Sequence, residues 1–126
     1  MGKKLVDLAR AVPEEKYGWR PGRGVRSVSE AYMHVASATF FLPTFAGVTM
    51  PEGVEPDMEK ETDKAKVLAA LARSFAYARN VVQDTPDDQL DRKAKWFSGE
   101  KTVRGVLLAL GNHAHEHLAS RSRTRA

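Results

Sequence analysis

The chain has 126 residues, of which 42% are hydrophobic and 29% are charged, proportions typical of one globular domain rather than a disordered or membrane protein. It contains no cysteine, which excludes disulfides, thiolate metal sites and cysteine nucleophiles. The formal net charge is +4, and three of those charges come from Arg121, Arg123 and Arg125, so the rest of the chain has too little excess charge to indicate a nucleic-acid partner.

The sequence carries no recognisable targeting or membrane signal. Asp7 and Arg10 interrupt the first apolar run, which a secretory signal would not tolerate. The apolar stretch at 40–50 contains a proline and a glycine and is too short to cross a bilayer. We therefore expect a cytoplasmic protein without a membrane partner, with one helical domain over residues 1–120 and a basic tail at 121–126.

The N-terminal segment predicts a short helix followed by an ordered loop. Residues 3–12 place apolar side chains at helical spacing, and Pro13 ends the pattern. The next residues, 13–25, are rich in proline and glycine and contain Tyr17 and Trp19. We expect both aromatic side chains to pack on the body of the protein.

A second helix is predicted from its capping residues. Ser27 and Glu30 have the spacing of a capping box, in which each side chain satisfies a free backbone amide of the first helical turn. The helix that follows carries apolar residues nearly all round and should end at Pro43. Residues 48–60 show no periodicity and predict a crossover loop.

A third, longest helix is predicted next. Thr62 or Asp63 can cap it, a broad apolar stripe follows, and the helix should end before Pro86. We expect a polar turn after it.

The last part of the chain predicts a turn and a fourth helix. Residues 95–99 indicate a short extended or turn segment in which Trp96 and Phe97 form a buried aromatic pair. Thr102 can cap a helix that runs to about Ala119. No segment alternates with a period of two for long enough to predict a sheet. Four helices with one long connection between the second and third predict an all-α fold, a four-helix bundle.

The histidines are the main functional signal. On a helical wheel His113 and His117 lie on the side of the apolar Leu110, whereas His115 points outward. Residues four apart on a helix can offer two imidazole nitrogens to one point in space. His34, on the second helix, is the remaining histidine and the candidate third ligand. Hydrogen-bonded core histidines are the alternative interpretation.

Three imidazoles would leave coordination positions open for water or substrate, and they suit zinc, nickel and other divalent ions. No general base or other catalytic residue is identified by the sequence. Glu30 lies one turn before His34 and could orient its ring, although its capping role is the simpler interpretation.

Five short motifs, spread in order over about nine-tenths of the chain, together resemble the pattern of a known protein family. They are Leu5-Val6-Asp7-Leu8-Ala9, Tyr17-Gly18-Trp19-Arg20-Pro21, Gly24-Val25-Arg26-Ser27-Val28-Ser29-Glu30, Phe97-Ser98-Gly99 and His113-Ala114-His115-Glu116-His117-Leu118. With His34 after the third motif, this set resembles the DinB-like (YfiT-like) family of bacterial metal-dependent four-helix proteins. The first helix is shorter than is usual there, and Ala119-Ser120 stands where that family generally has Gly-Gln, so the resemblance implies a domain shortened at both ends.

The resemblance implies a metal held by one histidine of the second helix and a pair on the last, which map to His34, His113 and His117. It also implies an enzyme that transfers a low-molecular-weight thiol to an electrophilic small molecule, or a hydrolase-like relative. The alternative is a non-catalytic metal-binding or stress-response bundle, for which short terminal helices would leave apolar surface suited to a homodimer.

Overall fold

The computed structural model describes residues 2–54, 57–97 and 99–113. Its regular elements are the helices α1 (Gly2–Ala11), α2 (Val28–Phe41) and α3 (Lys64–Asp84), the strands β1 (Lys93–Trp96) and β2 (Gly99–Thr102), and helical residues 103–113, here called helix 103–113. Single turns of 3-10 helix form η1 (Glu14–Lys16), η2 (Leu42–Ala46), η3 (Met58–Lys60) and η4 (Asp87–Gln89). The protein is predominantly helical, as the sequence predicts.

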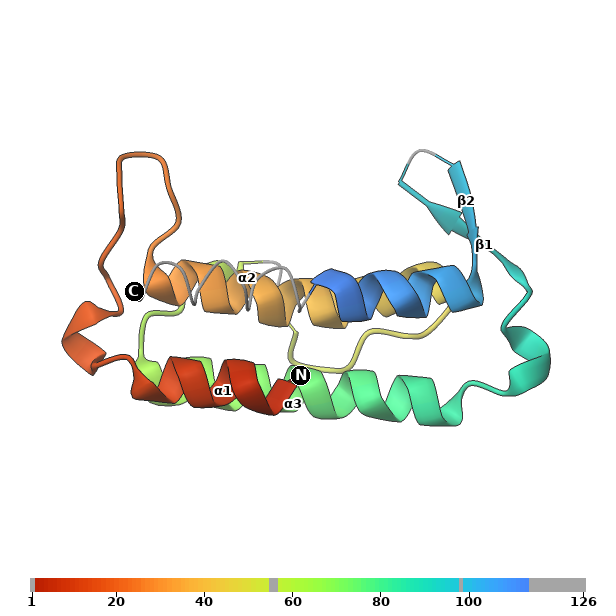
Figure 1. Cartoon of the computed structure of the whole chain (residues 1–126), viewed down its shortest axis with the longest axis horizontal. Coiled ribbons are helices and arrows are strands. Elements are labelled where there is room, and N and C mark those ends of the chain that lie inside the picture. The colour runs from red at the N-terminus through yellow and green to blue at the C-terminus, as the bar shows by residue number, and fades with distance from the viewer. Residues whose placement is uncertain (1, 55–56, 98, 114–126) are drawn as a thin grey trace.

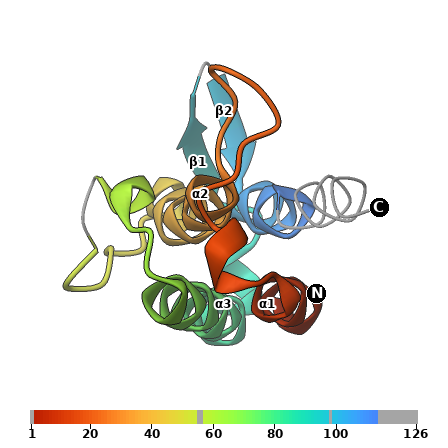
Figure 2. The ribbon, with the colours of Figure 1, turned by 90° about the vertical axis from the view of Figure 1, so that its left-hand side faces the viewer.

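The helices lie in two layers (Figure 1). One layer contains α2 and helix 103–113, and the other contains α3 and α1, as the end-on view in Figure 2 shows. The β1–β2 hairpin projects from one end of the first layer, and the loop between α1 and α2 projects from the opposite end. No helix in the described part of the chain is long and apolar enough to cross a membrane.

Three predicted helix caps are confirmed. The side-chain oxygens of Ser27, Asp63 and Thr102 each accept a hydrogen bond from the backbone N–H three residues later, at 3.2, 3.1 and 3.1 Å. Each of these bonds satisfies an amide that has no partner within its own helix. The starts of α2, α3 and helix 103–113 are therefore set by local sequence.

The prediction that the chain contains no sheet is wrong at the β1–β2 hairpin. The two strands pair antiparallel from Lys93 with Thr102 to Trp96 with Gly99. Strands of four residues are too short to show a clear alternation in sequence. The hairpin is closed at its base by a 2.9 Å hydrogen bond from the Val103 amide to the Arg92 carbonyl.

The predictions for the four aromatic residues Tyr17, Trp19, Trp96 and Phe97 have mixed outcomes. Tyr17 is buried, as predicted, but Trp19 is about half exposed. Trp96 and Phe97 do contact each other, with ring centroids 5.1 Å apart. Trp96 is partly buried, whereas 67% of the Phe97 surface is exposed because this residue lies at the tip of the hairpin. The predicted burial of Phe97 is therefore wrong.

The main core lies between α1, α2 and α3. Its buried side chains include Leu5 of α1, Tyr32 of α2 and Leu71 of α3. The end of α1 is tied to α3 by Lys64, whose Nζ donates to the carbonyls of Arg10 and Val12 at 2.8 and 2.7 Å. A cation at this position also suits the negative end of the helix dipole.

A second, smaller cluster connects the hairpin to helix 103–113. It is built from Ala46 of η2, Ala94 of β1, and Val103 and Val106. The guanidinium of Arg92 donates to the Ala46 carbonyl at 2.7 Å and so fixes the hairpin against η2, which follows α2. This cluster positions the hairpin beside the predicted histidine site.

Candidate functional site

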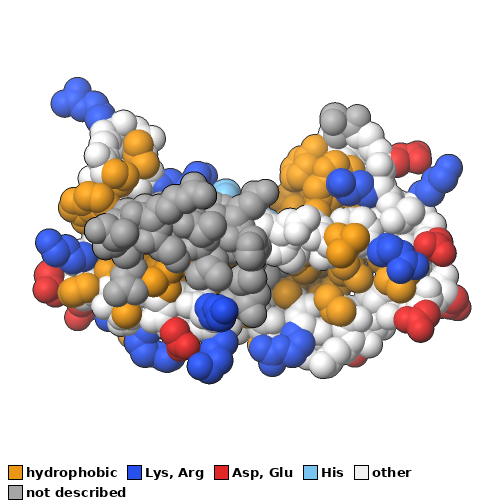
Figure 3. Space-filling model, viewed as in Figure 1, with side chains coloured by type: hydrophobic (Ala, Val, Ile, Leu, Met, Phe, Trp, Pro, Cys, Tyr) orange, Lys and Arg blue, Asp and Glu red, His pale blue; other side chains and the backbone are white. Residues whose placement is uncertain are grey.

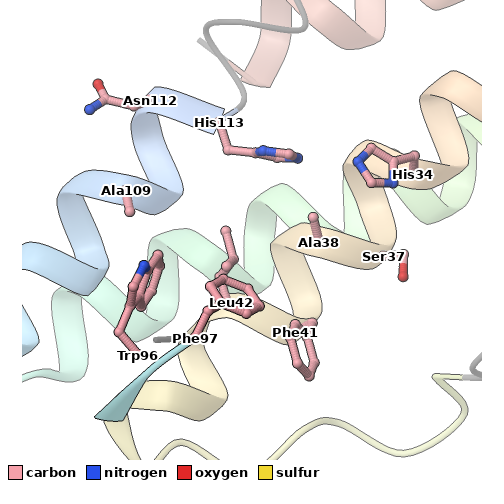
Figure 4. A pocket seen from close by; sticks show the side chains of 10 residues that line it. All are labelled: His34, Ser37, Ala38, Phe41, Leu42, Trp96, Phe97, Ala109, Asn112 and His113. Atoms are coloured by element: carbon pink, nitrogen blue, oxygen red, sulfur yellow. The ribbon is translucent and has the colours of Figure 1, made fainter. Parts of the chain in front are cut away.

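Two of the predicted metal ligands lie next to each other. His34 extends from α2 and His113 from helix 103–113, the two helices that lie side by side in one layer (Figure 2). Their ring centroids are 5.5 Å apart and the ring planes are inclined by 61°. Figure 4 shows the two rings turned toward each other across the gap between the helices. The other predicted ligand, His117, lies outside the described residues, as does His115, which the sequence predicts to face outward.

A carboxylate that sequence reasoning missed lies beside His34. Oε1 of Glu59, in η3, is 3.4 Å from His34 Nδ1, and the same oxygen accepts a 2.6 Å hydrogen bond from Arg26 Nε. A carboxylate at this nitrogen favours the tautomer whose Nε2 carries the lone pair. Glu59 falls within a loop without periodicity, and nothing in the sequence distinguishes it from neighbouring acidic residues.

Glu30, the residue considered for this role from the sequence, is engaged elsewhere. Its carboxylate pairs with the Arg20 guanidinium, and the Glu30 amide bonds to Ser27 as a helix cap. The hydrogen bond from Arg20 is the largest cause that lowers the pKa of Glu30. Glu30 therefore stabilises the start of α2, and Glu59 is the carboxylate found at His34.

The surroundings of His34 favour its neutral form. Burial is the largest cause that lowers the pKa of His34, the nearby charge of Arg26 adds to it, and His113 acts in the same direction. The negative charge of Glu59 opposes these effects and raises the pKa. A neutral imidazole is the form that binds a metal ion.

The imidazole nitrogens of His34 and His113 are donors of a kind that divalent metal ions accept. Two imidazoles approach from separate helices, and Nε2 of His113 is shielded from solvent. Imidazole nitrogens are favourable ligands for these ions. Within the described ranges, no three His, Cys, Asp or Glu side chains form a group that could hold a metal. The described residues therefore supply two imidazoles, and a three-ligand site would need a further ligand from outside those ranges.

A cavity of about 540 Å³ opens beside the histidine pair. It lies between α2, the hairpin and helix 103–113 (Figure 4). Its polar lining is contributed by His34, Ser37, Asn112 and His113, and the Asn112 amide points away from His34. The remaining lining side chains are apolar. A small molecule in this cavity would place one end near the imidazoles.

Aromatic rings form a connected cluster at the far side of the cavity from the histidines. The Phe45 ring is at its centre, with centroids 5.3 Å from Phe41, 5.0 Å from Trp96 and 4.8 Å from Phe97. Figure 3 shows a patch of hydrophobic side chains on the side of the hairpin that faces the middle of the molecule. The hairpin, absent from the sequence-based prediction, thus supplies two of the aromatic residues that line the cavity, Trp96 and Phe97.

Comparison with protein families identifies the fold and its relatives. The family model of the DinB superfamily matches residues 1–120. The chain belongs to the DinB superfamily. The family predicted from the short motifs is thereby confirmed, and proteins of this superfamily commonly bind metal.

A solved DinB-like structure has the same fold. The crystal structure of a DinB-like protein from Bacillus cereus ATCC 10987 superposes with a TM-score of 0.83 at 12% sequence identity. The alignment covers 96% of this chain and 81% of that chain. At this identity the similarity establishes the fold of this superfamily member and not its activity. No curated protein matches the sequence.

Proposed function

We propose that this DinB-superfamily protein is a metal-dependent enzyme whose divalent ion is held by His34, His113 and His117. The observation that carries the proposal is the pair of imidazole rings, 5.5 Å apart, beside a cavity large enough for a small-molecule substrate. Superfamily membership supports it, because metal binding is common among these proteins. The four helices would form a bundle that brings the ligands together.

The residues around the site have distinct roles in this proposal. Glu59 would orient His34, and Arg26 would hold the Glu59 carboxylate in place. Nε2 of His113 is buried, and shielding from water strengthens electrostatic interactions at that atom. A bound zinc or nickel ion would supply Lewis acidity that lowers the pKa of a thiol or water.

The reaction that we propose is transfer of a low-molecular-weight thiol to an electrophile, with hydrolysis as the related possibility. The resemblance of the motifs to thiol-transferring relatives suggests the reaction class. The cavity supports it, since its imidazole end suits a polar reacting group and its apolar end suits the rest of a substrate. Product formation from a thiol and an electrophile, followed with and without chelator, measures this activity.

Replacement of His113 tests the metal site. After purification with zinc or nickel and removal of free ions, elemental analysis should find stoichiometric metal in the wild type and little in His113→Ala. Asn112→Ala is the matched control, because Asn112 is the preceding residue of the same helix and its amide points away from His34. Full metal retention in His113→Ala would contradict the proposed ligand set.

A non-catalytic metal-binding protein that associates as a homodimer is the second candidate. The exposed aromatic and aliphatic side chains Phe41, Phe97 and Leu108 favour it, because they offer apolar surface to a second copy. Chelation separates the candidates. Loss of turnover with retained helical circular dichroism supports an enzyme, whereas unfolding without any turnover supports a structural metal. Light scattering after gel filtration reports the oligomeric state.

A further inference from the structure

The apolar side chains that line the cavity beside the histidines form one wall, here called the aromatic wall. Six of the cavity's lining side chains are apolar: Ala38, Phe41, Leu42, Trp96, Phe97 and Ala109. Among the described lining residues there is no Lys, Arg, Asp or Glu. Lys101, which lies 5.0 Å from the Trp96 ring centroid, is outside the lining. The lining itself therefore carries no formal charge.

Two aromatic side chains of this wall keep much of their surface available. Phe97 is 67% exposed and Phe41 is 43% exposed, although both rings are in contact with Phe45. Contacts with Phe45 orient the two rings, so a ligand that stacks on them does not have to order them first. Burial of aromatic surface and ring stacking are both favourable in water.

The polarity of the cavity changes along its length. The imidazoles of His34 and His113 lie at one end, while the hairpin aromatics Trp96 and Phe97 lie at the other (Figure 4). The volume of about 540 Å³ is in the range of sites that enclose drug-sized molecules. A charged group placed against the aromatic end would lose part of its hydration, and none of the lining side chains there is charged to replace it.

We propose that the aromatic wall binds the ring-containing, uncharged part of a small-molecule substrate, so that the reactive polar end of that substrate faces His34 and His113. The inference rests on the proposed function for the reaction at the histidines, but the binding of the apolar group does not require the metal. The substrate class is therefore a neutral aromatic or similarly bulky apolar electrophile. The uncharged lining disfavours polyphosphates and polycarboxylates, because burying their charge against it costs free energy.

A single-tryptophan form of the full chain tests this assignment. The chain has two tryptophans, and Trp19→Phe leaves Trp96, which lines the cavity, as the sole reporter. The neutral probe N-phenylnaphthylamine should quench Trp96 saturably. Its sulfonated counterpart, anilinonaphthalene sulfonate, adds a negative charge to a similar ring system and should bind at least about tenfold more weakly.

Matched variants locate the probe. In the Trp19→Phe background, Phe97→Ser removes an exposed ring of the wall and should weaken binding of the neutral probe about tenfold. Ala109→Leu narrows the cavity from helix 103–113 and should weaken it as well. Leu108→Ser is the control, because Leu108 is exposed on the same helix and does not line the cavity; binding should be unchanged.

The outcomes separate this inference from the proposed function. Equal affinity for the two probes, no saturable binding, or the same affinity in Phe97→Ser as in Leu108→Ser would overturn the assignment of the wall. Elemental analysis of the same samples reports the metal independently. Absence of metal from the wild type with selective binding of the neutral probe would overturn the metal site and leave the apolar subsite intact.

Discussion

The two apolar clusters of this protein differ in how completely they bury their large side chains. In the cluster between α1, α2 and α3, Tyr17, Tyr32 and Leu71 are almost fully shielded from solvent. In the cluster at the hairpin, the buried members are alanines and valines, the large Phe45 and Trp96 are only partly buried, and the neighbouring Phe97 stays mainly exposed. The first cluster is organised for stability, whereas the second leaves apolar surface available next to the histidines.

The largest expected effect is on the free energy of unfolding when a leucine is truncated to alanine in each of the two clusters. Leu71 is fully buried in the first cluster, so Leu71→Ala should lower the free energy of unfolding by about 2–5 kcal/mol. Leu107 is only partly buried against the hairpin cluster, so Leu107→Ala should lower the free energy of unfolding less, by about 1 kcal/mol. Urea denaturation of both variants measures the comparison. Equal losses would contradict the division into a stabilising and an available cluster.

A smaller effect is expected from Tyr17→Phe. The Tyr17 hydroxyl donates a buried 2.6 Å hydrogen bond to the Ala9 carbonyl, which joins the loop after α1 to that helix. Its loss leaves the carbonyl without this donor and should cost about 1–2 kcal/mol at neutral pH, measured by urea denaturation. Phe is close in shape, so the substitution isolates the hydroxyl.

The stability difference between the wild type and Tyr17→Phe should also depend on pH, in a direction that the pKa of Tyr17 predicts. Burial, and secondarily Tyr32, raises the pKa of Tyr17 from 10.0 to about 12. Because the folded pKa lies above the unfolded one, the contribution is complete below about pH 10 and is lost as the pH rises through about 12. The stability difference between the wild type and Tyr17→Phe should therefore shrink over that range. A constant difference would contradict the burial of this phenol.

The order of the helices could be predicted because local chemistry determines it. Ser27, Asp63 and Thr102 begin helices wherever the following residues have helical periodicity, and all three caps are found in the structure. The hairpin could not be predicted, because four-residue strands leave almost no periodic signal and their position depends on contacts such as that of Arg92 with Ala46. The exposure of Phe97 follows from its place at the hairpin tip.

The candidate site could be predicted only in part, for a related reason. His113 belongs to a pair with helical spacing, and His34 is the remaining histidine outside that segment. The sequence therefore offers one candidate partner for the pair, and the rings of His34 and His113 do lie close together. Glu59 comes from η3, and its approach to His34 depends on how the crossover loop packs against α2. The aromatic wall likewise depends on the tertiary placement of the hairpin.

The smallest expected effects are shifts in the pKa of His34 when its two charged neighbours are neutralised. The two shifts should have opposite signs. Arg26 lowers the pKa of His34 and Glu59 raises it. In the metal-free protein, Arg26→Gln should therefore raise the pKa of His34, and Glu59→Gln should lower it. Nuclear magnetic resonance titration of the imidazole measures both changes. Shifts of the same sign in the two variants would show that the two charges do not act on His34 as the structure indicates.

The central claim is that imidazoles from two helices share one metal ion. An anomalous difference map from crystals of the zinc- or nickel-loaded protein tests it most directly. We expect a peak between His34 and His113, about 2.0–2.1 Å from a nitrogen of each ring, with His117 as a further ligand. Crystals that contain metal by elemental analysis, but show no peak between His34 and His113, would contradict it.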